Sequence, residues 1–570
     1  MPAVPAPAYE QNPCYPPVGG EVAVGWAEPA SQLPEHSWVL AVDGPALLAW
    51  DRVVDGLCRL LDARGTATRR VDLRGWLAPW AEVVRATAFP PLANDPDFDR
   101  MADGELRQLF SELPQIGTSL TGIVVAFGPG AGLLTCDSLW YVDLPKRFAE
   151  ADVAAGRGHN LGQGPGDGNA TTKRLFYIDW PLLDRHRDAI ARRIDRWFDF
   201  QDPDRPTSID GQTLRQSMDA LARRPLRTRP TFNTTSWGGH WAQRRLGVNP
   251  DAANTALGYE LIAPESGVLV GDAAAAVELP FQLIVAVHPE QIMGAGVHET
   301  FGTSFPVRFD YLDTLGGGNL SVHCHPRPGY MSDVFGWPYP QHETYYLMVG
   351  GWGQKVFLGL RGDADVAEFH RLAQQAREEA VPLEIERFVQ VFPAAAHQLF
   401  CVPAGTPHGS GAGNVVLEIS ATPYLYSLRF YDWLRRGADD TQRPVHVEHA
   451  FDNLNTDRTG AAVGSELVQP PRTLRAGDGW REELLGSLPE MFFEVRRVVL
   501  SADVAVDDDT LGRFHVLNVV EGDGVEVAPV DAPHHVLAFA ETLLVPAAVG
   551  PYRLKRLGDQ PVRVVKALVR

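Results

Sequence analysis

Two histidines separated by one residue, His323 and His325, form the most informative pattern in the sequence. On a β-strand, residues i and i+2 point to the same side, so both imidazole rings can reach one ion. Glu343 lies in a second strand-like run, and His408 follows a tight turn in PAGTPHG. Three neutral imidazoles and one carboxylate suit Zn²⁺, and also Mn²⁺, Fe²⁺, Co²⁺ or Ni²⁺. We therefore predict a divalent-metal site, with Zn²⁺ favoured.

The segments around these residues predict short β-strands. From about residue 231, β-branched and aromatic runs alternate with clusters of Gly, Pro, Asn and Asp, which is typical of an all-β sandwich or barrel. One amphipathic helical segment, 363–380, interrupts the domain that we assign to 231–470. The remainder, 471–570, predicts a second small β-barrel, in which the metal pattern does not recur.

The amino-terminal part of the chain has a different secondary-structure pattern. Strand and helix signals alternate over 31–230, which predicts an α/β domain with a largely parallel sheet. Its opening VDGPALLAWDRVV (42–54) resembles the start of P-loop nucleoside kinases, but the G-x4-G-K-[ST] phosphate cradle is missing. We interpret it as a degenerate kinase-like domain used for docking, oligomerisation or sugar sensing. Residues 1–30, rich in Pro and Ala, are expected to form a flexible arm.

Composition limits the partners. With 51 basic and 71 acidic residues the net charge is −20, which argues against a general nucleic-acid binder. The five cysteines are widely spaced and odd in number, which favours free thiols and a cytoplasmic location. The chain begins with no signal-peptide pattern and has no apolar run long enough for a membrane span. We expect a small-molecule ligand, no nucleic acid and no membrane, and leave the oligomeric state open.

The order of the motifs resembles that of the cupin superfamily: G-x5-H-x-H, then E-x6-G, then P-x-G-x2-H. Within the cupins, the long insertion before the glutamate is similar to that of the type I mannose-6-phosphate (phosphomannose) isomerase family. The segments that carry this resemblance are LSVHCHP (320–326), QHETYY (341–346), GTPHG (405–409), LEIS (417–420) and LRFYDWLR (428–435). The resemblance covers about 231–570. It implies a multi-domain fold, in which a cupin barrel with a helical insertion and a second cupin-like barrel follow the α/β domain.

Carried over by motif, the resemblance assigns metal ligation to His323, His325, Glu343 and His408. Two further segments, 236–247 and 257–271, are similar to early segments of the family, and the second contains Glu260.

The catalytic positions also follow from the resemblance. Arg429 matches the active-site arginine, and Glu418 matches the glutamate of the E-x-Q motif. Three positions depart from the family motifs: His323 replaces Gln, Gln341 replaces Lys, and Ser420 replaces Gln.

The implied activity is metal-dependent aldose–ketose isomerisation of a hexose, with mannose 6-phosphate and fructose 6-phosphate as the favoured pair. The reaction needs a general base with a pKa near neutrality, and Glu260, Glu418 and His342 are the candidates. Two alternatives remain: another metal-cupin enzyme, such as an oxygenase or epimerase, and a non-enzymatic sugar-binding regulator.

Overall fold

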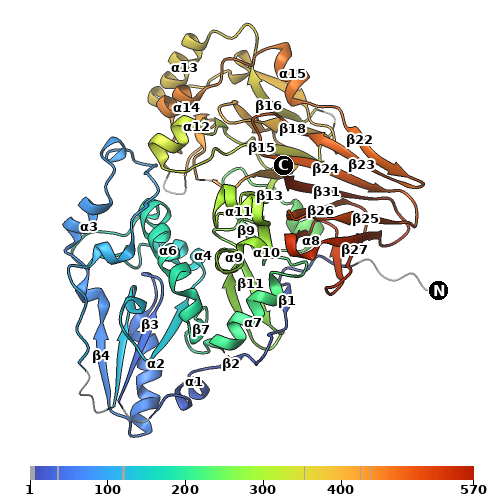
Figure 1. Cartoon of the computed structure of the whole chain (residues 1–570). Coiled ribbons are helices and arrows are strands. Elements are labelled where there is room, and N and C mark those ends of the chain that lie inside the picture. The colour runs from blue at the N-terminus through green and yellow to red at the C-terminus, as the bar shows by residue number, and fades with distance from the viewer. Residues whose placement is uncertain (1–6, 35–36, 118–121, 352, 424, 438–439) are drawn as a thin grey trace.

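The computed structural model describes residues 7–34, 37–117, 122–351, 353–423, 425–437 and 440–570 (Figure 1). In Figure 1 the amino-terminal sheet (blue to cyan) lies on one side and the carboxyl-terminal sheets (red) on the other, with green elements between them and yellow elements at the top of the view. The predicted combination of α/β and all-β parts is confirmed. None of the described helices has the length and apolar character needed to cross a membrane.

A seven-stranded sheet forms the core of the amino-terminal part. Its strands, in spatial order, are β2 (Ala23–Val24), β8 (Thr207–Asp210), β7 (Arg196–Asp199), β6 (Ser138–Asp143), β3 (Trp38–Asp43), β5 (Ile123–Phe127) and β4 (Thr68–Asp72). The five strands from β7 to β4 are parallel, β8 pairs antiparallel with β7, and β2 pairs antiparallel with β8. A central parallel strand is buried on both faces and is therefore apolar throughout, as β5 is, whereas the edge strand β4 is polar and partly exposed. The kinase-like character of this part remains a prediction.

Helices cover the two faces of this sheet. On one face, α2 (Trp50–Ala63) buries Val53, Leu57 and Leu61 in a separate core with residues of β3 and β5. On the other face lie α6 (Trp180–Ile190) and α7 (Gly211–Leu221), and α4 (Lys146–Ala154) packs against the start of α6. After β3 the chain passes through α2 and adds β4 and β5 on one side of β3. It then crosses over and adds β6 on the other side of β3. The direction of winding therefore reverses between β3 and β6, which opens a crevice at their carboxyl ends.

The central part contains two antiparallel sheets. The first has six strands: β18 (Leu399–Val402), β15 (Glu343–Val349), β20 (Val415–Ala421), β13 (Val307–Asp313), β10 (Leu257–Leu261) and β9 (Thr231–Asn233). The second has five: β17 (Val389–Pro393), β16 (Lys355–Leu360), β19 (His408–Ser410), β14 (Val322–Cys324) and β21 (Leu428–Tyr431). Helix α13 (Val366–Glu379) lies within the predicted insertion.

The predicted closed barrel does not form among the described residues. The two central sheets share no strand pairing, and each keeps its own edge strands. Four bulges or register shifts interrupt the pairing of β10, β14, β15 and β16, which bends these strands and ends regular pairing early. Side chains between the sheets, rather than a continuous ladder of hydrogen bonds, join the two halves.

A second pair of sheets forms the carboxyl-terminal part. One contains β22 (Arg472–Gly477), β23 (Trp480–Gly486), β24 (Phe493–Leu500), β31 (Val562–Val569), β26 (His515–Glu521) and β29 (Thr542–Val545). The other contains β25 (Ala505–Asp509), β30 (Pro551–Arg556), β27 (Gly524–Pro529) and β28 (His535–Ala538). Alternate apolar residues of both sheets meet in one core, for example Leu517 and Leu554.

Residues 7–30 do not form the predicted flexible arm; residues 1–6 lie outside the described residues. Strand β1 (Cys14–Tyr15) pairs in parallel with β11 (Gly267–Gly271), which continues antiparallel into β12 (Ala276–Pro280). Figure 1 shows β1 in dark blue far from the other blue strands. The expectation fails because a Pro-rich segment is already extended, and can add hydrogen bonds to the edge of another sheet while burying its tyrosines.

Shorter helices connect these sheets and cover their ends. They are α1 (Ala27–Ser31), α3 (Trp80–Thr87), α5 (Thr172–Arg174), α8 (Trp241–Leu246), α9 (Phe281–Val287), α10 (Pro289–Met293), α11 (Ala295–Phe301), α12 (Pro328–Tyr330), α14 (Val447–Asn453) and α15 (Ala461–Leu467). All five cysteines are free thiols, as predicted.

Candidate metal centre

Three histidines meet where β14 and β19 lie side by side. His323 lies in β14 (Val322–Cys324), His325 is the first residue after this strand, and His408 is the first residue of β19. His323 and His408 are opposite partners in the antiparallel pair, and their ring centroids lie 4.3 Å apart. Nitrogen atoms of all three rings lie within 4.8 Å of one another. The structure therefore brings together the three histidines predicted as ligands.

The carboxylate comes from the facing sheet. Glu343, the first residue of β15, places Oε1 2.8 Å from His325 Nε2 and Oε2 3.0 Å from His408 Nε2. All four side chains are buried, and none is more than 7% exposed. The predicted ligand set thus spans the two central sheets, with β15 on one side and β14 and β19 on the other.

Backbone carbonyls orient each ring. The Nδ1 atoms lie 3.0 Å from the Ser321 oxygen for His323, 3.1 Å from the Tyr426 oxygen for His325, and 2.9 Å from the Thr406 oxygen for His408. A carbonyl only accepts hydrogen bonds, so each Nδ1 carries the proton and donates it. The Nε2 atoms of the neutral rings are left with lone pairs directed toward the centre.

These atoms fit a bound cation. The Nε2 atoms of His325 and His408 and Oε2 of Glu343 are buried without a hydrogen-bond partner among the described residues. Lone pairs of two nitrogens facing a carboxylate at about 3 Å repel one another unless a positive charge lies between them. Three imidazole nitrogens and one carboxylate are a donor set for Zn²⁺ or a similar divalent ion.

The protonation states agree with metal ligation. Burial lowers the pKa of His325, and burial together with the neighbouring rings lowers that of His323 well below its usual value. Burial alone would raise the pKa of Glu343, but His325 and His408 hold it well below its usual range. Neutral imidazoles and an ionised carboxylate are the forms that bind a metal.

Gln341 orients the carboxylate ligand. Its Nε2 donates a hydrogen bond to Glu343 Oε1 over 2.5 Å, and its side chain is 1% exposed. At this position the resembling motif has a lysine. In this chain the residue therefore contacts the ligand Glu343 instead of supplying a cation, since an amide carries no charge.

A cavity of about 180 Å³ opens beside the centre. Its walls include His323, Glu343 and the predicted catalytic residues Glu418 and Arg429. Further polar residues that the sequence did not single out also line it: Tyr259, Arg308, Asp310, Tyr345, Ser427 and Arg443. Two of the four predicted metal ligands and two of the three predicted catalytic residues thus line one cavity.

One arginine organises the acidic side of the cavity. Arg308 forms an ion pair with Glu418, donates to Ser420 Oγ over 2.6 Å, and lies 3.6 Å from Asp310. Glu418 is 3% exposed, and burial raises its pKa well above the usual value. Glu418 therefore orients Arg308 in addition to lining the cavity. Ser420, the residue that departs from the family motif, completes this contact.

Arginines form the opposite side. Arg429 is the strand partner of His323, and its guanidinium donates to the Pro444 carbonyl over 3.1 Å. Burial, followed by the nearby charge of Arg443, lowers the pKa of Arg429. Arg443 also pairs with Asp432 over 3.0 Å, whereas among the described residues the Arg429 side chain has only the carbonyl contact given above. Arg429 is therefore the cation of this wall best placed for an anionic group.

Glu260 lies elsewhere, although it was predicted as catalytic. It does not line the cavity; its carboxylate accepts hydrogen bonds from Tyr9 Oη and, over 2.9 Å, from the Thr542 backbone N–H. A register shift between Tyr259 and Leu261 changes which residues of β10 face inward, so that Tyr259 reaches the cavity. The structure therefore joins Glu260 to the amino-terminal segment and the carboxyl-terminal sheets. His342, another candidate base, accepts from the Ala404 N–H and also lies outside the cavity lining.

The Glu260→Gln substitution tests this placement. We expect it to lower the free energy of unfolding by about 1–3 kcal/mol, because it weakens a buried charged hydrogen-bond network, and to leave turnover unchanged. Urea unfolding and steady-state kinetics measure the two effects. A tenfold lower kcat with normal metal content would instead assign Glu260 to the chemistry.

Asp310 is the main site residue that sequence reasoning missed. In VRFDYLD (307–313), the side chains of Arg308, Asp310 and Leu312 alternate along β13 and line the cavity. The sequence contained one usable pattern: charged residues alternate with apolar residues in an otherwise buried strand. Alternate residues of a strand face the same side, so this pattern places the charged side chains together on one face.

Comparisons with known proteins bear on two parts of the chain. A family model described as a domain of unknown function, DUF8485, matches residues 25–223. A mannose-6-phosphate isomerase of Streptococcus mutans is 24% identical over 305 residues, which is 53% of this chain and 86% of that protein.

Among solved structures, the mannose 6-phosphate isomerase of Bacillus subtilis is 17% identical with a TM-score of 0.48, over 60% of this chain and 99% of the other. A variant of the phosphomannose isomerase of Salmonella typhimurium is 14% identical with a TM-score of 0.47, over 61% and 100%. Over about half of its length, the chain is therefore similar in sequence to a mannose-6-phosphate isomerase.

Proposed function

We propose that the protein is a metal-dependent aldose–ketose isomerase of a hexose phosphate, with mannose 6-phosphate and fructose 6-phosphate as the favoured pair. The observation that carries the proposal is the three-histidine, one-carboxylate centre at the wall of a cavity that is also lined by arginines and by the Asp310 carboxyl. The sequence similarity to a mannose-6-phosphate isomerase supports the same class of reaction.

His323, His325, His408 and Glu343 hold the ion, for which Zn²⁺ is favoured by the nitrogen-rich donor set. When bound, a divalent ion at this place supplies Lewis-acid polarisation of the sugar oxygens. Gln341 keeps the Glu343 carboxylate in position through its hydrogen bond.

Asp310 is the group we assign to proton transfer. Aldose–ketose isomerisation moves a proton between C1 and C2, which requires a base that is ionised near neutral pH. Asp310 Oδ1 is buried without a hydrogen-bond partner among the described residues. Burial raises the pKa of Asp310 to about 6, with Arg308 opposing the rise. Its carboxylate therefore takes and returns the proton, while Arg308 keeps it from being protonated above that pH.

Arg429 and Arg443 bind the anionic end of the substrate. The chain carries a net charge of −20, so an anionic sugar needs local cations. The Arg429 pKa is lowered first by burial and then by Arg443, and a phosphate dianion between them relieves that repulsion.

The Asp310→Asn variant tests the proposed base. We expect kcat to fall by about 10²–10⁴-fold with metal content unchanged, because asparagine keeps the shape but cannot accept a proton. In the wild-type protein, kcat/KM falls as pH decreases through about 6, since the base becomes protonated there. A variant that keeps its kcat and its acid limb would exclude Asp310 as the base.

The direct test of the function is an assay of the zinc-loaded protein with mannose 6-phosphate and fructose 6-phosphate, beside free mannose and fructose. We expect interconversion of the phosphorylated pair. Absence of turnover for every sugar contradicts the isomerase proposal, and metal-dependent oxygen consumption would point to an oxygenase instead.

A further inference from the structure

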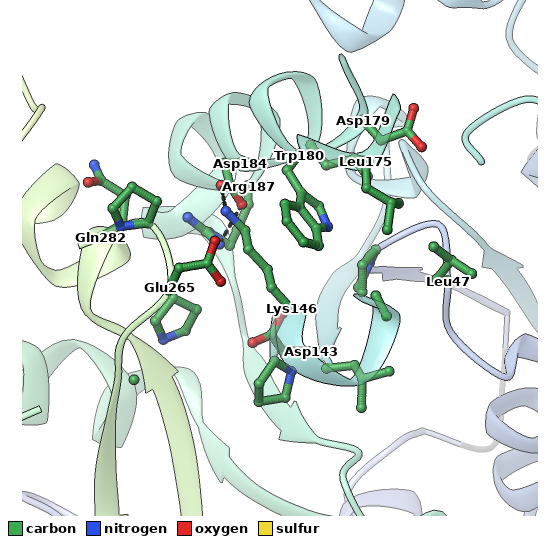
Figure 2. Close-up of a pocket in the computed structure, with 18 of the residues that line it drawn as sticks. Leu47, Asp143, Lys146, Leu175, Asp179, Trp180, Asp184, Arg187, Glu265 and Gln282 are labelled. Atoms are coloured by element: carbon green, nitrogen blue, oxygen red, sulfur yellow. Dashed lines mark hydrogen bonds and ion pairs between the residues drawn. The ribbon is translucent and has the colours of Figure 1, made fainter. Parts of the chain in front are cut away.

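A second cleft lies at the crevice between β3 and β6, where the winding of the seven-stranded sheet reverses. Figure 2 shows its lining side chains, which come from the loops after β3 and β6, from α4 and α6, and from residues around β11 and α9. Lys146, Trp180, Asp184, Glu265 and Gln282 also line an adjoining space of about 320 Å³. None of these residues lines the metal-site cavity. The reversal point of an open α/β sheet is the place where such sheets bind ligands.

One buried carboxyl in this cleft lacks a partner. Asp143, at the carboxyl end of β6, is 7% exposed and lines the cleft. Among the described residues its carboxylate makes no direct hydrogen bond or ion pair, although the charge of Arg187 acts on it and opposes the effect of burial on its pKa; Asp184, nearby, contacts Lys146 over 2.6 Å and Arg187 over 3.0 Å. Burial raises the pKa of Asp143 to about 7. A buried polar group without a partner costs stability unless a ligand or water satisfies it.

The cations of the lining are already paired. Five acidic side chains line the narrow part, against two cations, Lys146 and Arg187. Both cations are bound to carboxylates, since Arg187 also contacts Asp188 over 2.8 Å. Cations behind the lining pair with two of the acidic side chains: Arg147 and Arg229 with Glu278, and Arg174 with Asp179. A phosphate would therefore have to displace an existing ion pair, which a neutral ligand need not do.

The mixture of groups suits hydroxyls. Carboxylates accept hydrogen bonds, the Lys146 ammonium donates them, and a carboxyl that titrates near pH 7, such as Asp143, does either. A cationic amine only donates hydrogen bonds, so a site for an amine would contain acceptors and no donor such as Lys146. Trp180, whose ring lies under Lys146 at 5.0 Å, adds an apolar wall of the kind that faces the C–H groups of a sugar ring.

We propose that this cleft is a second ligand site, separate from the metal centre, which binds a neutral monosaccharide or the corresponding sugar alcohol, with Asp143 accepting from or donating to its hydroxyls. The proposal does not depend on isomerase activity. It gives the amino-terminal part a binding role that needs no phosphate cradle.

Isothermal titration calorimetry of the whole zinc-loaded chain with D-mannose, D-fructose and mannitol tests the proposal. We expect saturable binding of at least one probe. The Asp143→Asn change should weaken it about tenfold or more, because it removes a charged partner of a buried hydrogen bond. Gln282→Ala, at a partly exposed position where misfolding is not a concern, should weaken it about threefold to fivefold.

Two matched variants identify the site. Asp152→Asn changes an exposed carboxyl outside the cleft, on helix α4, which also carries the cleft residue Lys146. This variant should bind the sugar normally. His408→Ala, at the metal centre, should also keep the binding, whatever becomes of catalysis. The proposal is overturned if no probe binds, if Asp143→Asn and Gln282→Ala bind as tightly as the wild type, or if His408→Ala abolishes binding. Preferential binding of inorganic phosphate or of spermidine would overturn it equally.

Discussion

Purified His408→Ala protein is expected to contain almost no divalent metal and to have no measurable isomerase activity. His408 is one of the three proposed nitrogen ligands and is fully buried between the two central sheets. Changes outside a ligand set already weaken metal binding by roughly 10–100-fold, so the loss of a ligand should exceed about 100-fold. Metal analysis after dialysis, together with the sugar assay, measures both effects.

His342→Gln is the matched control. His342 is the chain neighbour of the ligand Glu343, but its Nδ1 accepts from the Ala404 backbone N–H over 3.1 Å. Glutamine can keep that contact, so metal content and turnover should stay at the wild-type level. If His408→Ala retains one equivalent of zinc, the proposed centre is refuted.

The second large effect concerns Arg308. Its guanidinium is the cation closest to three buried carboxylates: it pairs with Glu418, lies 3.6 Å from Asp310 and 3.7 Å from Glu343. Arg308→Met leaves these charges uncompensated in the interior. We expect the free energy of unfolding of the metal-free protein to fall by about 3–5 kcal/mol at pH 8. Urea unfolding in the presence of a chelator measures the loss.

The loss should depend on pH. Asp310 has a folded pKa of about 6, above its unfolded value of about 3.9, so ionisation destabilises the folded state as pH rises through that window. Without Arg308 the folded pKa of these carboxyls rises further. The pH range over which their ionisation destabilises the folded state then extends to higher pH. The difference in stability between wild type and variant should therefore grow from pH 5 to pH 8. An equal loss at both pH values would contradict this account.

Arg361→Ala serves as the control for removal of an arginine. Arg361 pairs with Asp363 at the surface, where the two side chains are 45% and 72% exposed. Exposed pairs contribute about 0–1 kcal/mol, so this variant should unfold like the wild type at either pH.

The grouping of the candidate metal ligands could be predicted because their geometry is largely local. Two histidines at a spacing of two on a strand face one way whatever the rest of the fold does, and a Pro–Gly turn sets the start of β19. The pairing of His323 with His408 joins residues far apart in the sequence, and only the order of the motifs indicated it.

Other features depend on detail that no short pattern contains. The shift between Tyr259 and Leu261 decides whether Glu260 or Tyr259 faces the cavity, and a bulge of this kind has no firm sequence signature. The role of Asp310 depends on Arg308 beside it and on the space in front of it. The cleft at Asp143 depends on the spatial order of the strands, whereas the sequence gives only their chain order.

The contacts of residues 9–15 also constrain the order in which the chain can be completed. Tyr9 binds Glu260, the Glu10 backbone N–H donates to Glu541 over 2.7 Å, and β1 pairs with β11. These residues are synthesised before their partners, which follow more than 200 and more than 500 residues later along the chain. Loop closure over such separations follows the folding of the parts it joins. The segment is therefore fixed only after its partners have folded, and its docking marks the assembly of all three parts of the molecule.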